Sequence, residues 1–434
     1  MIDTQLTAAR AGMITPAMQI VAEYEKLPPE SIRSGVADGT IVIPANINHK
    51  NLHPCGIGRQ LYTKVNANIG NSSTSSCLNG ELAKLRNVLK FKADTVMDLS
   101  SGNNIREIRQ CILENSPIPV GTVPIYEMVS RFGRKNLSRE IMLQIIEEQA
   151  QQGVDYMTIH AGFKKSYIPA AMKRKLKIVS RGGALLAAYM SDSGNENPFY
   201  ECFDDILDIC RRYDVTLSLG DGLRPGCLAD ASDEAQFAEL ETLGELVTRC
   251  RNAGVQSMVE GPGHVPMDQI QMNMLKEQQI CHDAPFYILG PVVIDCAPGY
   301  DHLTAAMGGM LGAFYGAAML CYVTPKEHLG LPDMDDVARG ITAFRIAAHA
   351  ADVGLHKVGA RTQDDAISDA RAEFDWEKQF SLALEPERAR AYRTEALRAA
   401  EADDKHCGKY CTMCGPDFCS VRLSAELKKL QGEK

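Results

Sequence analysis

Residues 156–162 (YMTIHAG) and 216–222 (TLSLGDG) are short apolar runs that end in polar residues and glycine. Seven further short apolar runs are found, and most of them also end in polar residues or glycine: residues 64–70, 95–100, 120–126, 178–183, 256–263, 286–290 and 320–324. Amphipathic patterns of helical period separate many of them, for example at residues 139–153 and 237–254. Strands that alternate with helices in this way are typical of a parallel α/β sheet. Eight or nine such units favour a closed (β/α)8 barrel over an open sheet.

The length of 434 residues allows two or three domains. We expect an N-terminal region over residues 1–62, with short helices and one strand at 40–44, followed by the barrel over residues 63–361. From residue 362 the chain is charged and helical, and three helices are expected at residues 364–373, 375–384 and 386–403. This helical C-terminal domain, residues 362–434, carries a run of cysteines near its end.

Composition and charge limit the partners of this chain. Hydrophobic residues make up 45% and charged residues 23%, which is usual for a soluble globular protein. A net charge of −9 without any block of Lys and Arg argues against nucleic acid as a partner. The start, MIDTQLTAARAG, has neither the basic residues nor the apolar stretch of a secretion signal. In the absence of such a signal, the 14 cysteines indicate a reducing, cytoplasmic location rather than a disulfide framework.

Residues 303–323 carry no charge and approach the length of a membrane span. Gly308, Gly312 and Gly316 recur at four-residue spacing, which lets helices pack closely. We therefore expect a tightly packed core helix that leads into the buried strand at 320–324, and no membrane partner.

Chemically versatile side chains follow the ends of most of the expected strands. They are Asn68, Met97, Tyr126, His160, Arg181, Asp221, Arg224, Glu260 and His264. The carboxyl ends of barrel strands meet at one mouth, where barrel enzymes carry their active sites. We expect the active site there, with Glu260 and Asp221 as acid or base groups and Tyr287 as a proton donor or stacking contact.

Four segments suit an anionic group. Residues 180–183 (SRGG) combine a guanidinium with glycines that expose backbone N–H groups, and residues 221–226 (DGLRPG) add a second arginine. Residues 66–70 (NANIG) and 100–102 (SSG) supply further hydrogen-bond donors. The pattern predicts a phosphorylated substrate.

His264 and His328 are candidate metal ligands at the same mouth. Two imidazoles with water or substrate suit Zn2+ or a similar ion. His302 and His282 are alternatives for this role. Cys296 and Cys227 have no neighbour that marks an activated nucleophile, and we expect them to be buried small residues.

Cys411, Cys414 and Cys419 form a Cys-x2-Cys-x4-Cys run. Three thiolates can bind three irons of a 4Fe–4S cluster and leave the fourth iron open to S-adenosylmethionine. A structural zinc site is the alternative, for which Cys407 could supply a fourth thiolate. Spacing alone leaves both open.

Together these segments resemble one protein family. The motifs NANIG, DTVMDLS, GTVPIY, VDYMTIHAG, IVSRGG, LSLGDGLRPG, AQFAELETLGEL, VEGPGHVPM, HDAPFYILGP, APGYDH, CYVTPKEHLGLP, RIAAHAAD and CTMCGPDFC are similar to those of the thiamine pyrimidine synthase family of radical S-adenosylmethionine enzymes. The resemblance implies a (β/α)8 barrel, a homodimer, a C-terminal cluster domain, an electron donor and 5-aminoimidazole ribotide as substrate.

The resemblance also implies roles for individual residues. Substrate contacts would be Asn68, Met97, Tyr126, His160, Ser180, Arg181, Gly182, Asp221, Gly222, Leu223, Arg224, Glu260 and Tyr287. Metal ligands would be His264 and His328 for zinc and Cys411, Cys414 and Cys419 for the 4Fe–4S cluster. Cys407 has no counterpart.

The resemblance covers enzymes that catalyse two different reactions on the same substrate. This chain departs from the usual pyrimidine synthase pattern at residues 176–179, 294–297 and 303–308, which are expected to flank the substrate. We therefore expect a 5-hydroxybenzimidazole synthase of cobamide biosynthesis, and keep as alternative the synthase that makes the hydroxymethylpyrimidine phosphate of thiamine. Outside this family, the alternatives are a non-radical metal-dependent barrel enzyme with a zinc tail and a binding protein without turnover.

Overall fold

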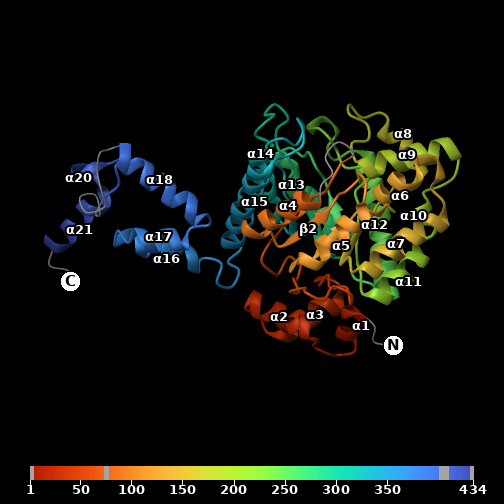
Figure 1. Ribbon diagram of the computed structural model, residues 1–434, viewed down its shortest axis with the longest axis horizontal. Coiled ribbons are helices and arrows are strands. Elements are labelled where there is room, and N and C mark those ends of the chain that lie inside the picture. Colours follow the sequence, from red (N-terminus) through yellow and green to blue (C-terminus); the bar gives the residue numbers. More distant parts are fainter. Residues whose placement is uncertain (1–3, 73–77, 400–409, 431–434) are drawn as a thin grey trace. The chain divides into compact units, whose positions relative to one another are not determined.

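The computed structural model describes residues 4–72, 78–399 and 410–430 (Figure 1). Eight parallel strands pair in sequence order, and β1 pairs with both β2 and β8, so the sheet closes into a barrel. The strands are β1 Lys64–Ile69, β2 Thr95–Asp98, β3 Val120–Thr122, β4 Tyr156–Ile159, β5 Thr216–Leu219, β6 Ser257–Gly261, β7 Phe286–Leu289 and β8 Met319–Cys321. The predicted (β/α)8 barrel is confirmed.

Two of the expected strands are absent. Residues 178–183 form no strand, because Ser180 is the N-cap of a helix and accepts a hydrogen bond from the backbone N–H of Gly183 at 3.1 Å. Residues 40–44 contribute only an isolated bridge between Val42 and Ile57. Both runs are apolar enough for a strand, but a helix start follows the first, and the second has no neighbouring strand to extend it.

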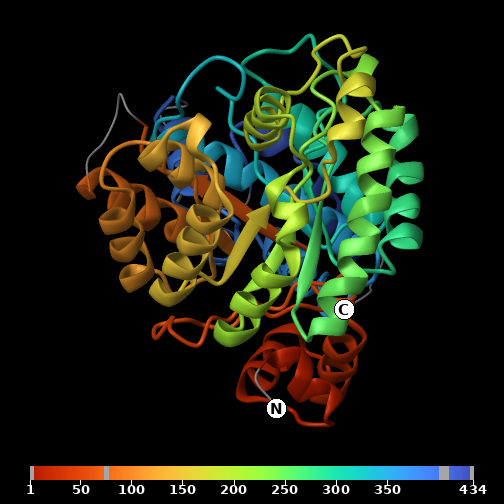
Figure 2. The same ribbon diagram turned by 90° about the vertical axis from the view of Figure 1, so that its right-hand side faces the viewer.

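Helices surround the barrel (Figure 2). The longer ones are α4 Leu78–Lys90, α5 Ile105–Asn115, α6 Pro124–Phe132, α7 Arg139–Gln152, α9 Arg181–Ser193, α11 Phe203–Tyr213, α12 Glu234–Ala253, α13 Met267–Ile280, α14 Asp301–Phe314 and α15 Met334–Gly354. Short pieces interrupt the loops: η1 Arg134–Asn136, η2 Lys165–Tyr167, α8 Ile168–Ala171, α10 Pro198–Glu201 and η3 Leu228–Asp230. Most bury an apolar stripe against the strands, and one large apolar cluster fills the space between strands and helices.

Three N-terminal helices, α1 Gln5–Arg10, α2 Pro16–Glu25 and α3 Pro29–Asp38, lie at one end of the barrel (Figure 2). They have a small apolar core of their own. Glu25 is paired with Lys64 at 2.7 Å, and both side chains are 1% exposed. Because Lys64 begins β1, the helices cover the amino-terminal end of the strands, opposite the expected mouth.

The uncharged stretch 303–323 forms α14 and β8, as expected. A Cβ atom at Gly308 would lie 2.0 Å from the carbonyl oxygen of Pro291, so glycine is needed for this close approach. Among the residues that the structure describes, no helix is long and apolar enough to cross a membrane.

The chain divides into two compact units, Met1–Val358 and Gly359–Lys434. The second unit contains α16 Thr362–Ala372, α17 Trp376–Leu382, α18 Pro386–Ala399, α20 Gly415–Phe418 and α21 Ser420–Leu430. Within it, Arg393 stacks on Trp376 with its guanidinium 3.9 Å from the ring centroid.

Candidate active site

The interior of the barrel below the mouth is polar and fully hydrogen-bonded around Asn66. Its side-chain oxygen accepts hydrogen bonds from the hydroxyls of Tyr156 and Thr95, both at 2.9 Å. Its amide nitrogen donates to the hydroxyl of Tyr287 at 2.7 Å and to Asn68 at 2.9 Å. These alternate residues of the strands point inward, as the period of two requires. The floor under the mouth therefore has a fixed arrangement of donors and acceptors.

Glu260, at the end of β6, is held by two hydroxyl groups. Thr158 donates to one carboxyl oxygen at 2.7 Å, and Ser218 donates to the same oxygen at 2.8 Å. Burial raises the pKa of Glu260, although both hydroxyls and Arg224 lower it. The second carboxyl oxygen can therefore accept a hydrogen bond from a ligand in the mouth. The sequence predicted Glu260 but not its two supporting hydroxyls, Ser218 on the adjacent strand β5 and Thr158 on β4, the next strand beyond it.

Asp221 and Arg224 face each other across the loop after β5. The guanidinium of Arg224 lies 3.1 Å from one oxygen of Asp221, whereas the other oxygen is buried and has no hydrogen-bond partner in the described structure. Burial raises the pKa of Asp221 to about 8; Arg224 opposes this shift and Glu260 adds to it. An unpartnered buried oxygen is costly unless a ligand satisfies it.

His160 follows β4 and lies against the start of α9. Burial, aided by the Arg224 guanidinium, lowers the pKa of His160 to about 3, so its ring is neutral. A Cβ atom at Gly182 would lie 2.3 Å from this ring, which explains the glycine. Arg181, the first residue of α9, stacks over Tyr126 at 5.0 Å from the ring centroid. A helix N-terminus with an adjacent arginine suits an anion.

These side chains line two adjoining cavities at the carboxyl ends of the strands, with volumes of about 130 and 640 Å³. Predicted residues in the smaller cavity are Asn68, Met97, Tyr126, His160, Arg181, Asp221, Arg224, Glu260 and Tyr287. The larger one also contains His264 and His328. Ser180 and Leu223 are buried behind this lining, where they support Arg181 and Arg224. The structure thus brings the predicted barrel residues together at one mouth.

The two candidate zinc ligands are close to each other and are held in the same manner. The rings of His264 and His328 have centroids 5.2 Å apart. Nδ1 of His264 is 2.8 Å from Asp295, and Nδ1 of His328 is 2.9 Å from Asp301. A carboxylate on one ring nitrogen orients the other toward a metal. The donor set fits a divalent metal; zinc itself stays a prediction.

The two alternative histidines are less suited to this role. His282 lies in the turn between α13 and β7, which is at the amino-terminal end of the barrel, away from the mouth. His302 is the second residue of α14, and burial lowers its pKa. The sequence missed Asp295 and Asp301, although Asp301 stands next to His302 in a motif that was already recognised. No group of three or more potential metal ligands converges within the described residues.

The cysteine run lies in the second unit. Cys414 precedes the short helix α20, and Cys419 follows it; Cys419 is buried, while Cys411 is partly exposed. The backbone N–H of Cys414 lowers the pKa of the Cys411 thiol, whereas burial and the Cys411 thiolate raise the pKa of the Cys414 thiol. Three thiols within nine residues fit a cluster with one open iron. Cys407 lies outside the described residues.

The two cysteines near the mouth differ from each other. Cys227 is buried and donates to Asp230 at 3.3 Å. Cys296 is exposed, so the expectation that it is a buried small residue was wrong. It follows the exposed residues Ile294 and Asp295 in the loop after β7, where no strand or helix covers it.

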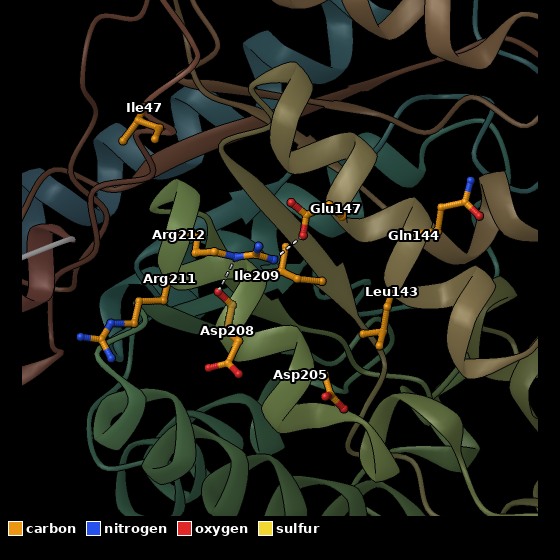
Figure 3. Close-up of a pocket in the computed structure, with 9 residues that line it drawn as sticks. All are labelled: Ile47, Leu143, Gln144, Glu147, Asp205, Asp208, Ile209, Arg211 and Arg212. Atoms are coloured by element: carbon orange, nitrogen blue, oxygen red, sulfur yellow. Dashed lines mark hydrogen bonds and ion pairs between the residues drawn. The ribbon is translucent and has the colours of Figure 1, made fainter.

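A further groove lies on the outside of the barrel between α7 and α11 (Figure 3). It is lined by Ile47, Leu143, Gln144, Glu147, Asp205, Asp208, Ile209, Arg211 and Arg212. Arg212 forms an ion pair with Glu147. None of the predicted site residues lines this groove, and it is open to solvent, so we assign the chemistry to the barrel mouth.

A closed barrel whose charged and polar side chains converge at the carboxyl ends of the strands is the architecture of a TIM-barrel enzyme. The sequence pattern of the Radical SAM ThiC family matches residues 4–426, and the chain belongs to that family. Membership implies a 4Fe–4S cluster and S-adenosylmethionine as cofactors. It therefore favours iron–sulfur over structural zinc at the three cysteines.

Two archaeal relatives are similar over almost the whole chain. The phosphomethylpyrimidine synthase of Haloarcula marismortui is 55% identical over 426 residues, which cover 98% of this chain and 88% of that protein. The phosphomethylpyrimidine synthase of Halobacterium salinarum is 54% identical over 428 residues, covering 98% and 89%. Among solved structures, 7,8-dihydropteroate synthase of Vibrio fischeri ES114 gives a TM-score of 0.41 at 10% identity and covers 72% of this chain and 99% of that chain. A similarity that weak supports no conclusion.

Proposed function

We propose that this chain is a phosphomethylpyrimidine synthase, a radical S-adenosylmethionine lyase that converts 5-aminoimidazole ribotide to the hydroxymethylpyrimidine phosphate of thiamine. The observation that carries the proposal is identity of 55% across 98% of the chain with a protein of that name. The proposal includes an external electron donor and a homodimer, as the family resemblance implies. It replaces the 5-hydroxybenzimidazole product that we expected first.

The sequence differences that favoured the benzimidazole product lie mostly away from the cavities. Ile294, Leu303 and Met307 are exposed by 45%, 45% and 58%, and none of them lines the two cavities at the mouth. Leu176 and Val179 do line the larger cavity, but on its solvent side, where they are 50% and 37% exposed. Exposed positions vary easily between relatives, so these differences do not indicate a different intermediate.

The phosphate of the ribotide is assigned to Arg181, Arg224 and the N-terminus of α9. Arginine binds phosphate through paired N–H donors, and the first backbone N–H groups of a helix have no partner within the helix. Arg224 is already oriented by Asp221 at 3.1 Å. Arg181 is exposed in the described structure and rests on Tyr126, so it can reach an incoming phosphate without losing a buried contact.

The aminoimidazole and ribose are assigned to the buried acids. Glu260 can accept a hydrogen bond from the exocyclic amine, because Thr158 and Ser218 hold its carboxyl in place. The free oxygen of Asp221 can bind a ribose hydroxyl or a ring nitrogen. His160 is neutral and so offers one donor and one acceptor nitrogen without adding charge. Tyr287 contributes a buried hydroxyl fixed by Asn66.

Cys411, Cys414 and Cys419 are the residues that would hold the cluster. With S-adenosylmethionine, a 4Fe–4S cluster supplies one-electron cleavage of a C–S bond and thereby a radical that abstracts hydrogen. His264 and His328 would hold a divalent metal, oriented by Asp295 and Asp301. The residues of the mouth bind the ribotide and keep water from the reacting atoms.

The test is anaerobic incubation of the reconstituted protein with 5-aminoimidazole ribotide, S-adenosylmethionine and a reductant. We expect hydroxymethylpyrimidine phosphate and 5′-deoxyadenosine, and neither from the matched variant Cys414→Ser. Formation of 5-hydroxybenzimidazole alone would restore our first interpretation. Absence of 5′-deoxyadenosine from protein with a full cluster would refute radical chemistry altogether.

A further inference from the structure

Glu239 is a buried carboxyl on α12 to which the proposed function gives no role. It lies in residues 235–246 (AQFAELETLGEL) and is 2% exposed. One of its oxygens accepts the backbone N–H of Leu223 at 2.7 Å, and the backbone N–H of Gly222 also faces its carboxyl. These two peptides lie between Asp221 and Arg224. Glu239 therefore holds the centre of the loop whose ends bind the ligand.

The same peptide supports the start of α9. A Cβ atom at Gly183 would lie 2.2 Å from the carbonyl oxygen of Gly222, so the two backbones are in direct contact. A Cβ atom at Gly222 would lie 3.0 Å from Glu239 and 3.4 Å from Gly183. Gly222 is thus packed between the carboxyl on one side and the N-terminal turn of α9 on the other. A shift of this peptide would displace Arg181 as well as Arg224.

A third loop packs on the side chain of Glu239. A Cβ atom at Gly162, two residues after His160, would lie 3.3 Å from Cγ of Glu239 and 2.4 Å from Leu243. The loops after β4 and β5 therefore both pack on Glu239, and the start of α9 packs on the loop after β5 through Gly222. Each of these segments approaches its neighbour through a glycine, which leaves room for the close contact.

We infer that Glu239 is a positioning residue that fixes Arg181, Arg224 and Asp221 relative to one another before the ribotide binds. It touches no ligand itself; it acts through the peptide of Gly222 and Leu223. The inference rests on the proposed function for the identity of the ligand, but not for the geometry of the loop.

The ionisation of Glu239 is compatible with this role. Burial, together with the carboxyl of Asp221, raises the pKa of Glu239 well above its usual value, while the N–H groups of Leu223 and Gly222 lower it. A neutral carboxyl still accepts hydrogen bonds through its carbonyl oxygen. Glutamine offers the same acceptor at the same length, so Glu239→Gln is the conservative variant. Leucine removes the acceptor and replaces it with an apolar side chain of similar size.

Two measurements on the full chain test the inference. The first is the Kd of 5-aminoimidazole ribotide by calorimetry, where we expect Glu239→Leu to bind about ten- to hundredfold more weakly and Glu239→Gln to bind about as well as the parent protein. The second is hydrogen exchange of the ligand-free protein, where residues 220–226 and 180–185 should exchange faster in Glu239→Leu alone. The matched control is Glu277→Leu on α13, since Glu277 is also fully buried but neither of its carboxyl oxygens has a hydrogen-bond partner in the described structure.

Unchanged exchange of both segments in folded Glu239→Leu would overturn the inference. So would equal loss of ribotide affinity in Glu239→Leu and Glu277→Leu, because that would show a general effect of stability. If the parent protein does not bind the ribotide, the proposed function fails, while hydrogen exchange still decides the role of Glu239. If Glu239→Leu does not fold, the same two measurements are made on Glu239→Ala at low temperature. Hydrogen exchange and a ribotide Kd equal to those of the parent protein would then overturn the inference.

Discussion

The mouth of the barrel and the cysteine run differ in how completely the chain builds them by itself. At the mouth, Glu260, Asn66 and the loop of Asp221 are fixed by hydrogen bonds between 2.7 and 3.1 Å, before any ligand binds. Around the cysteines, Met413 and Phe418 are 87% and 82% exposed, and no three described side chains surround a metal position. The fold by itself orients the side chains of the proposed substrate site, whereas we propose that the three cysteines take their final arrangement when the cluster binds.

The largest effect is expected from Cys414→Ser. Loss of one of three thiolates leaves an iron without its ligand, so cluster content and 5′-deoxyadenosine should fall to background while the Kd for the ribotide stays the same. Iron and sulfide analysis with calorimetry measures both. Cys296→Ser, which alters an exposed cysteine in the other unit, is the control. Loss of ribotide binding in Cys414→Ser would show that the two regions are not independent.

Arg224→Gln should abolish tight ribotide binding without affecting the cluster. It removes the proposed phosphate contact and takes from Asp221 the hydrogen bond that orients its carboxyl, so the Kd should rise about hundredfold. Arg212→Gln, in the outer groove of Figure 3, should change the Kd by less than twofold. Calorimetry on both variants compares them directly. If Arg224→Gln binds the ribotide as tightly as the parent protein, the phosphate does not bind at this loop.

Stability should depend on pH through Asp221. Its carboxyl has a pKa of about 8 in the folded protein and about 4 when unfolded, so it is neutral in the fold over a range where the unfolded chain is ionised. The folded state therefore loses stability as pH rises from about 4 to about 8. The variant Asp221→Asn cannot ionise at this position, so its stability does not fall in this way. The difference in free energy of unfolding between the variant and the parent protein should therefore grow by up to about 1.4 kcal/mol per pH unit. Urea unfolding of both proteins between about pH 4 and pH 8 measures this difference. Curves of stability against pH that run parallel for the two proteins would contradict the prediction.

A smaller effect is expected from Asp301→Asn on metal binding. An amide in place of the carboxylate orients His328 less well and makes it a weaker ligand, so zinc affinity should fall about ten- to hundredfold. Asp283→Asn, next to His282 at the other end of the barrel, should leave it unchanged. Competition with a chelator measures both. Equal zinc affinity in the two variants would show that His328 is not a ligand of the metal.

The order of strands could be predicted from the sequence because most strands end in a recognisable segment of polar residues or glycine. Residues 178–183 were misassigned because Ile178 and Val179 look like a strand. The signal for the correct structure was Ser180, a preferred N-cap residue, followed by the first turn of α9.

The supporting residues of the site could not be found in this way. Thr158 and Ser218 hold Glu260 from β4 and β5, and Glu239 reaches its loop from the second turn of α12. Such contacts depend on the register of the barrel and on side-chain directions, neither of which is visible in the chain itself. Asp301 was the exception, since its place beside His302 offered a hint.

The contact between Glu25 and Lys64 decides how the protein can be shortened. A truncated protein that begins at residue 63 would keep the Lys64 ammonium inside the end of the barrel without its carboxylate, at a cost of about 3–5 kcal/mol. That is a large share of the stability of an ordinary domain. The first sixty residues therefore cannot be trimmed to obtain a minimal barrel, and fusion tags should be added ahead of them.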